Sequence, residues 1–161
     1  MEPVPTNRVL TLGVLGGSSG MVAGLFVASS LGALRGVPLD WPLRLGASLV
    51  LGSTALHSSG WPADVVGLLV LAALGAMGGI WFAFLCDWFP GLAETPGTLV
   101  LAGLTYAELL WLIGFYIFGF LLWPWLTSTD PVTYFLAATA GGASLGAGLV
   151  LAGVHRSRRL D

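Results

Sequence analysis

The amino-acid sequence predicts an all-α, polytopic membrane protein with four transmembrane helices and one short interfacial helix. Three observations predict this class: four apolar stretches long enough to cross a bilayer, one formal charge inside them, and turn or charge signals at their ends. The composition agrees, because 56% of the 161 residues are hydrophobic, 9% are charged and the mean hydropathy is +0.89. These values exclude a water-soluble domain.

The four spans follow from the length of a helix that crosses the bilayer core, about 20 apolar residues. The stretches that reach this length cover residues 9–34, 65–86, 98–123 and 131–154. Proline, glycine or charged residues follow the first three, as in Asp87-Trp-Phe-Pro-Gly after the second. We expect residues 1–161 to form a single four-helix bundle.

A fifth apolar stretch, residues 45–56, is too short to span. Trp41-Pro precedes it and Gly60-Trp-Pro follows it. This framing favours an interfacial helix or a shallow re-entrant segment.

The arginines predict the orientation in the membrane. The first stretch is too long for the apolar core of a secretory signal, so it counts as a span. With four spans both termini share one side, and cytoplasmic segments carry the excess of positive charge. The terminal side holds Arg8, Arg156, Arg158 and Arg159, against Arg35 and Arg44 opposite. We therefore expect cytoplasmic termini, in a bacterial inner membrane.

Small residues form a ridge along the first span, where Gly16, Gly20, Gly24, Ala28 and Gly32 recur at every fourth position. Helices in lipid associate through close packing, so such a ridge marks a contact face. The second and fourth spans add Gly75, Gly79, Gly142 and Gly146. Two interpretations stay open: the bundle uses all of these faces internally, or one is left for another protein's helix.

The third span is bulky, with Trp111, Phe115, Tyr116, Phe118 and Phe120. An aromatic wall of this kind suits lipid, a flat cofactor such as a quinone or pigment, or a neighbouring subunit. The sequence leaves these three occupants open.

Glu108 is the single charge inside the spans. Intramembrane acids are costly and are functional candidates by default. Measured back from Trp123, Glu108 lies off-centre, and Thr105 one turn earlier is placed to donate a hydrogen bond to it. Its role is a proton relay, an acceptor for a partner helix or ligand, or a protonated structural group.

Other residue types narrow the chemistry. Six arginines without a lysine and a net charge of −2 give no basic stripe, which excludes nucleic acid as an expected partner. The lone Cys86 supplies neither a disulfide nor a metal cluster, and we expect it to be an apolar filler. His57 and His155 fall on opposite membrane faces, so no haem is expected within the chain. Catalytic and metal-binding motifs are missing, and an enzyme is not expected.

The run GMVAGLFVASSLGALRGVPLDWPLRLGASL, from Gly20 to Leu49, the later DWFPG and the aromatic third span resemble small four-span bacterial membrane proteins. The resemblance implies the architecture and no activity.

Together these features predict a non-catalytic accessory subunit of a larger membrane complex, such as an electron-transport or photosynthetic assembly. Its expected partners are lipids and other integral-membrane subunits. The alternative is a small oligomeric transporter or proton-conducting protein that uses Glu108.

Overall fold

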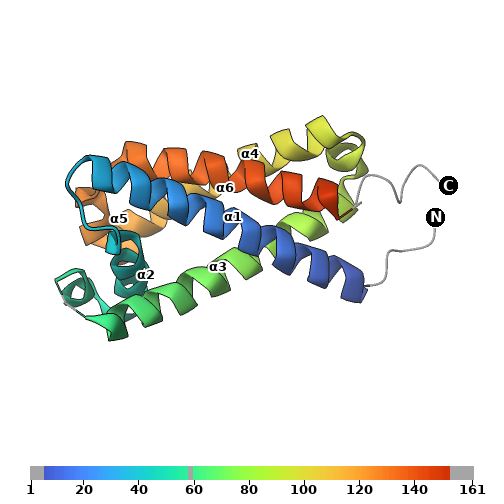
Figure 1. The fold of residues 1–161 in the computed structure, drawn as a ribbon. Helices are drawn as coiled ribbons and strands as arrows, with labels where there is room; N and C mark the ends of the chain where they lie inside the picture. The colour runs from blue at the N-terminus through green and yellow to red at the C-terminus, as the bar shows by residue number, and fades with distance from the viewer. Residues whose placement is uncertain (1–5, 58–59, 153–161) are drawn as a thin grey trace.

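The computed structural model describes residues 6–57 and 60–152, and every regular element within these ranges is a helix (Figure 1). Four helices have the length and apolar composition of membrane spans. They indicate an integral membrane protein, as the sequence predicts. The span helices are α1 (Thr6–Leu34), α3 (Trp61–Trp88), the continuous helix Pro96–Leu122 and α6 (Pro131–Leu151).

The helix Pro96–Leu122, here called the α4–α5 helix, changes its winding along its length. It consists of α4 (Pro96–Leu112), a π-helical segment η3 (Ile113–Phe118) and α5 (Gly119–Leu122). A capping box starts it, because the Thr95 hydroxyl accepts a hydrogen bond from the backbone N–H of Thr98 while the Thr98 hydroxyl accepts one from that of Thr95.

The helix boundaries differ from those expected because proline begins helices in this chain. The second span starts at Trp61 instead of residue 65, and Pro62 occupies its first turn. The third starts at Pro96 instead of residue 98. A proline at this position loses no hydrogen bond, since the first N–H groups of a helix have no internal partner. The predicted end of the fourth span, residue 154, lies outside the described residues.

A buried apolar cluster lies at the end of the bundle where α1 begins and α6 finishes (Figure 1). Helix α1 packs on both α3 and α6, and α6 packs on α4. Side chains join α3 to α4, because the Tyr106 hydroxyl donates a hydrogen bond of 2.9 Å to the carbonyl of Gly78. The core at this end contains Phe82, Cys86, Ala93, Leu99, Leu145 and Leu149.

At the other end, the short helix α2 (Trp41–Leu51) lies between the end of α1 and the start of α3 (Figure 1). A short 3-10 helix, η1 (Ser53–Leu56), follows it, so the fifth apolar stretch is helical but begins four residues before residue 45. Helix α2 packs on α3, and Ala47 and Ser48 are fully buried. One face of α2 is therefore part of the protein interior.

The 3-10 helix η4 (Pro124–Ser128) connects the third span to the fourth. Two tryptophans at its start form hydrogen bonds to α2. The indole N–H of Trp123 donates to the carbonyl of Leu49 across 3.1 Å, and that of Trp125 donates to the Ser48 hydroxyl across 3.0 Å. Both tryptophans thus act as hydrogen-bond donors within the protein.

Candidate functional site

The predicted ridge of α1 faces α6 over three of its five positions. A methyl group placed on Gly20 would lie 2.7 Å from the carbonyl oxygen of Gly141, and one on Gly24 would lie 3.1 Å from that of Ala137. A methyl group on Gly16 would lie 3.1 Å from the Cδ1 atom of the Leu145 side chain. At Gly20 a side chain would collide with the α6 backbone, so the close approach there requires glycine.

The ridge does not continue to Gly32. The nearest atoms to a methyl group there belong to Val37, at 3.6 Å, in the loop that follows α1. Ala28, one turn before it, is 5% exposed. The α1–α6 approach through glycine therefore ends before the last turn of α1.

Gly13 and Gly17 form a second ridge of α1, which packs closely against α3. A methyl group on Gly13 would lie 2.6 Å from the Cα of Ile80, and one on Gly79 would lie 2.6 Å from the Cα of Gly17. A methyl group on Gly75 would lie 2.9 Å from the Cβ of Met21. Gly13 and Gly17 are not in the ridge predicted from the sequence, although they share its four-residue spacing.

The α6 glycines pack on α4. A methyl group on Gly142 would lie 2.5 Å from the carbonyl oxygen of Gly103, and one on Gly146 would lie 2.7 Å from that of Leu99. Gly103 was missed because the bulky third span shows no continuous ridge. The predicted glycines of α1, α3 and α6, apart from Gly32, thus meet helices of their own chain.

Glu108 also makes its contact inside the chain. The Thr139 hydroxyl of α6 lies 3.1 Å from Oε1 of Glu108 and donates to it, and it lies 3.0 Å from the carbonyl oxygen of Phe135. Thr105 is exposed on the preceding turn of α4. Among the described residues, the hydroxyl that bonds Glu108 is that of Thr139, not of Thr105.

Glu108 lies in the central part of the long α4–α5 helix. At ~1.5 Å per residue, Glu108 lies roughly 18 Å from Pro96 and roughly 21 Å from Leu122. Glu108 is therefore near the middle of its helix, whereas counting back from Trp123 across one bilayer thickness placed it off-centre. The difference arises because the helix is longer than the bilayer core is thick.

Aromatic rings surround the next turn of α4. The Trp111 ring lies 5.3 Å from the Phe135 ring, edge to face, and 5.7 Å from the Phe115 ring. The indole nitrogen of Trp111 is buried without a hydrogen-bond partner among the described residues. Of the four spans, the α4–α5 helix is the least covered by the rest of the chain.

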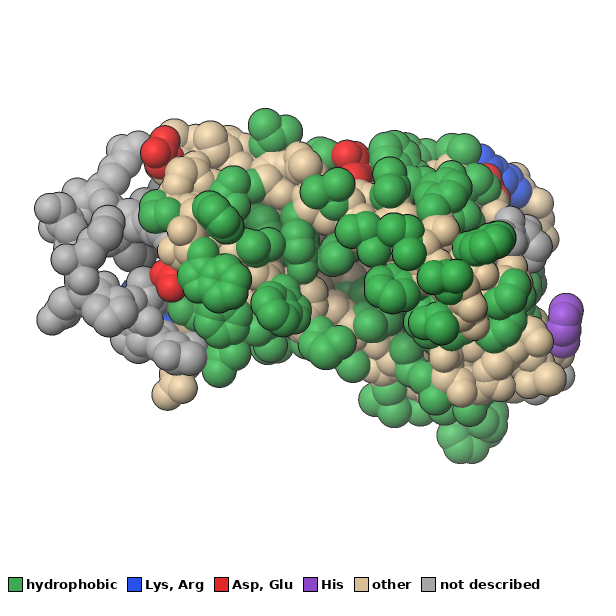
Figure 2. Space-filling view, turned by 180° about the vertical axis from the view of Figure 1, so that it is seen from behind, with side chains coloured by type: hydrophobic (Ala, Val, Ile, Leu, Met, Phe, Trp, Pro, Cys, Tyr) green, Lys and Arg blue, Asp and Glu red, His purple; other side chains and the backbone are tan. Residues whose placement is uncertain are grey.

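The outer surface of the molecule is mainly apolar. Figure 2 shows hydrophobic side chains over most of one face, with acidic side chains towards the ends and one part-way along. On the α4–α5 helix the exposed large side chains include Leu109, Leu112, Tyr116, Phe118 and Phe120. These residues and Glu108 form a surface that begins on α4 and continues through η3 into α5. We call this surface the outer face of α4.

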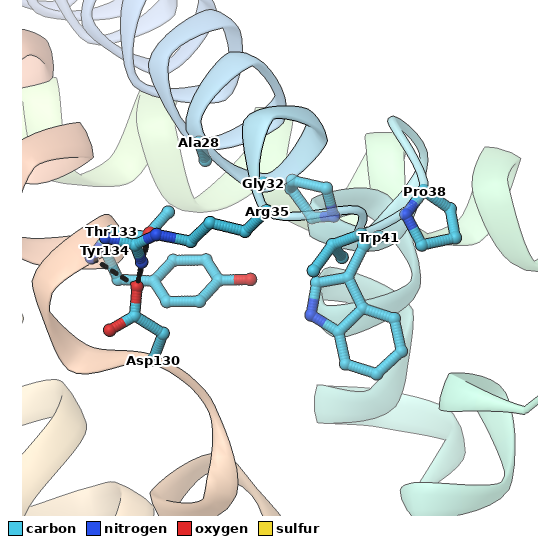
Figure 3. Close-up of a pocket in the computed structure, with 10 residues that line it drawn as sticks. Ala28, Gly32, Arg35, Pro38, Trp41, Asp130, Thr133 and Tyr134 are labelled. Carbon is cyan, nitrogen blue, oxygen red and sulfur yellow. Dashed lines mark hydrogen bonds and ion pairs between the residues drawn. The ribbon is translucent and has the colours of Figure 1, made fainter.

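Charged residues at the α2 end of the bundle form two clusters. Arg35 at the end of α1 pairs with Asp130, whose carboxylate caps the first turn of α6 (Figure 3). Arg44 of α2 bonds Asp40, and its Nε lies 3.9 Å from Oδ1 of Asp64. The Arg35–Asp130 and Arg44–Asp64 pairs join different helices, which sequence inspection did not show.

The cysteine and the histidine that the structure describes do not lie together. Cys86 is 2% exposed within the core, whereas His57 is exposed at the end of η1. His155 lies outside the described residues. Among residues 6–57 and 60–152, no group of three or more His, Cys, Asp and Glu side chains could hold a metal ion.

Comparison with protein-family models, curated proteins and solved structures finds no match to this chain. Functional inference therefore rests on its own geometry.

Proposed function

We propose that this protein is a non-catalytic accessory subunit of a larger integral-membrane assembly. In this proposal the outer face of α4 receives a helix of a partner subunit. An electron-transport or photosynthetic complex of a bacterial inner membrane is the host class that fits, with both termini of the chain in the cytoplasm.

One observation carries the proposal: among the described residues, the half-buried Glu108 side chain has one hydrogen-bond donor, Thr139, on one of its two oxygens. A carboxyl group has about four acceptor positions. At mid-span the lipid tails offer no donor, and an unsatisfied polar group in hydrocarbon costs free energy. A hydroxyl, amide or basic side chain from a neighbouring subunit would supply the missing bond.

The packing inside the chain supports the same face. The glycine ridges of α1, α3 and α6 meet helices of their own bundle, so they offer little close-packing surface to a partner. The α4–α5 helix carries large exposed aromatic side chains beside Glu108. Aromatic side chains supply large contact areas in interfaces.

Photo-crosslinking in native membranes tests the proposal. A photoreactive amino acid replaces Leu112 or Tyr116 on the outer face of α4, and Val22 on the outer side of α1 serves as the control because it is similarly exposed. We expect Leu112 and Tyr116 to crosslink to another membrane protein and Val22 to crosslink mainly to lipid. Crosslinks to lipid at all three positions would contradict the proposal.

A second function, proton conduction by an oligomer, is favoured by the mid-span level of Glu108. Its test is pH-gradient-driven flux in proteoliposomes, compared between the natural protein and Glu108→Gln. Conduction through Glu108 requires a flux in the natural protein that the glutamine variant loses. Equal flux in the two, or none in either, excludes it.

A further inference from the structure

A small cavity of about 70 Å³ lies at the α2 end of the bundle (Figure 3). The end of α1, the loop after it, the start of α2 and the start of α6 enclose it. Ala28 and Gly32 contribute apolar surface, whereas Arg35, Trp41 and Tyr134 contribute side chains with polar atoms. A space of this size holds a few heavy atoms, or about two water molecules.

The cavity lies beside the ends of two candidate membrane spans. Arg35 directly follows the last residue of the first span, and Asp130 directly precedes the first residue of the fourth. Trp41 and Tyr134 both line the cavity. Tryptophan and tyrosine with polar atoms at this level are typical of the membrane–water interface.

Asp130 is already saturated and positions Arg35. Its Oδ2 accepts from the backbone N–H of Thr133 at 3.2 Å and from the Thr133 hydroxyl at 2.5 Å, and it pairs with Arg35. Its Oδ1 accepts from the backbone N–H of Val132 at 3.3 Å. The positive end of the α6 dipole stabilises this negative charge further.

Arg35 keeps donors to spare. Its hydrogen bond to the Thr133 hydroxyl, 2.6 Å long, and its ion pair with Asp130 both use NH1. A guanidinium group has five N–H donors, and within the described ranges no hydrogen bond uses Nε or the second terminal nitrogen, so both are left for another acceptor. The Arg35 side chain is 47% exposed, which leaves room for that acceptor.

Tyr134 supplies a further donor from the cavity wall. Figure 3 shows its ring beside Arg35, with the hydroxyl pointing across the gap towards Trp41. The Trp41 and Tyr134 side chains both line the cavity. Among the described residues the Tyr134 hydroxyl hydrogen has no acceptor. Arg35 and Tyr134 thus line the same cavity from its two sides.

We propose that this cavity binds the phosphate group of a membrane phospholipid. Arg35 donates from Nε and its second terminal nitrogen, a two-donor geometry that suits phosphate oxygens. The Tyr134 hydroxyl donates to a further phosphate oxygen. The shared chemistry is a phosphate ester or ion, and the lipid is the proposed source because the cavity adjoins the ends of two candidate spans.

Binding to the delipidated, detergent-purified full chain tests this site. The probes are dioleoylphosphatidylethanolamine, dioleoylglycerol with the same acyl chains but no phosphate, and inorganic phosphate. We expect the phospholipid to raise the thermal unfolding midpoint and to remain bound in native mass spectrometry. Dioleoylglycerol should do neither. An equal shift with inorganic phosphate alone would support the phosphate site but assign it to the free ion.

Four variants separate the site from general lipid binding. Arg35→Gln should weaken phospholipid binding by about tenfold, the loss of charge-assisted hydrogen bonds. Tyr134→Phe should weaken it severalfold, and Arg35→Lys should fall between the natural protein and Arg35→Gln. Arg8→Gln, at the opposite membrane face, is the control. If Arg35→Gln does not fold, Arg35→Lys and Tyr134→Phe decide. Undiminished phospholipid binding in these two variants, or equal stabilisation by dioleoylglycerol, would overturn the proposal.

Discussion

The Thr139 hydroxyl on α6 donates a hydrogen bond to Oε1 of Glu108 on α4, across 3.1 Å. The bond lies near the middle of α4–α5 and joins two helices whose backbones touch at Gly103 and Gly142. It is a polar contact at the level where lipid offers no competing partner.

Replacing Thr139 with valine should lower the free energy of unfolding by about 1 kcal/mol, because interhelical hydrogen bonds in membranes have this size. Unfolding in mixed micelles of increasing dodecyl sulfate content measures the change. Thr105→Val is the matched control, since it removes the same hydroxyl from an exposed position of α4. Equal losses in the two variants would show that the Glu108 bond does not stabilise the bundle.

The glycine contacts predict a sharp difference between two substitutions. A methyl group at Gly17 would overlap the carbonyl group of Gly75, so Gly17→Ala should separate α1 from α3 and cost about 1–3 kcal/mol. At Gly114 a methyl group meets no described atom within 4 Å. Gly114→Ala should therefore be neutral or stabilising by about 0.5–1 kcal/mol. The same dodecyl sulfate titration compares them, and a stable Gly17→Ala would contradict the α1–α3 packing.

The spans were predictable because hydropathy is a local property of each stretch of sequence. The ridge through Gly16, Gly20 and Gly24 was predictable for the same reason, since its spacing repeats within one helix. Its partner was not, because a glycine carries no side chain that identifies what it touches. Thr139 could not be chosen over Thr105 as the partner of Glu108 without the register between two helices. The donors around the candidate phosphate site depend on contacts between residues about a hundred positions apart.

The cap of α6 should matter more than the ion pair beside it. Asp130→Ala removes the acceptor of the first N–H groups of α6 and should cost about 1 kcal/mol. Asp130→Ser keeps a capping oxygen but loses the pair with Arg35, whose partners are both more than 40% exposed. Exposed pairs contribute about 0–1 kcal/mol, so Asp130→Ser should lie close to the natural protein. Thermal unfolding followed by circular dichroism measures both, and equal destabilisation by the two variants would assign the stability to the ion pair.

The bond between Trp125 and Ser48 should hold α2 in place. Ser48 is fully buried, so Ser48→Ala and Trp125→Phe should each destabilise the protein, and their effects should not add. A double-mutant cycle should give a coupling of about 1 kcal/mol. Hydrogen exchange of residues 41–51 locates the effect, and faster exchange there should exceed any change in α6. A coupling of zero would mean that the bond contributes nothing to seating α2.

Trp123 and Trp125, which form hydrogen bonds to α2, are synthesised well after it. Their acceptors, the Leu49 carbonyl and the Ser48 hydroxyl, leave the ribosome more than seventy residues before Trp123 and Trp125 do. While the second and third spans are being inserted, α2 lacks the hydrogen-bond donors of Trp123 and Trp125. The two bonds that complete the packing of α2 therefore form only after the third span has been synthesised.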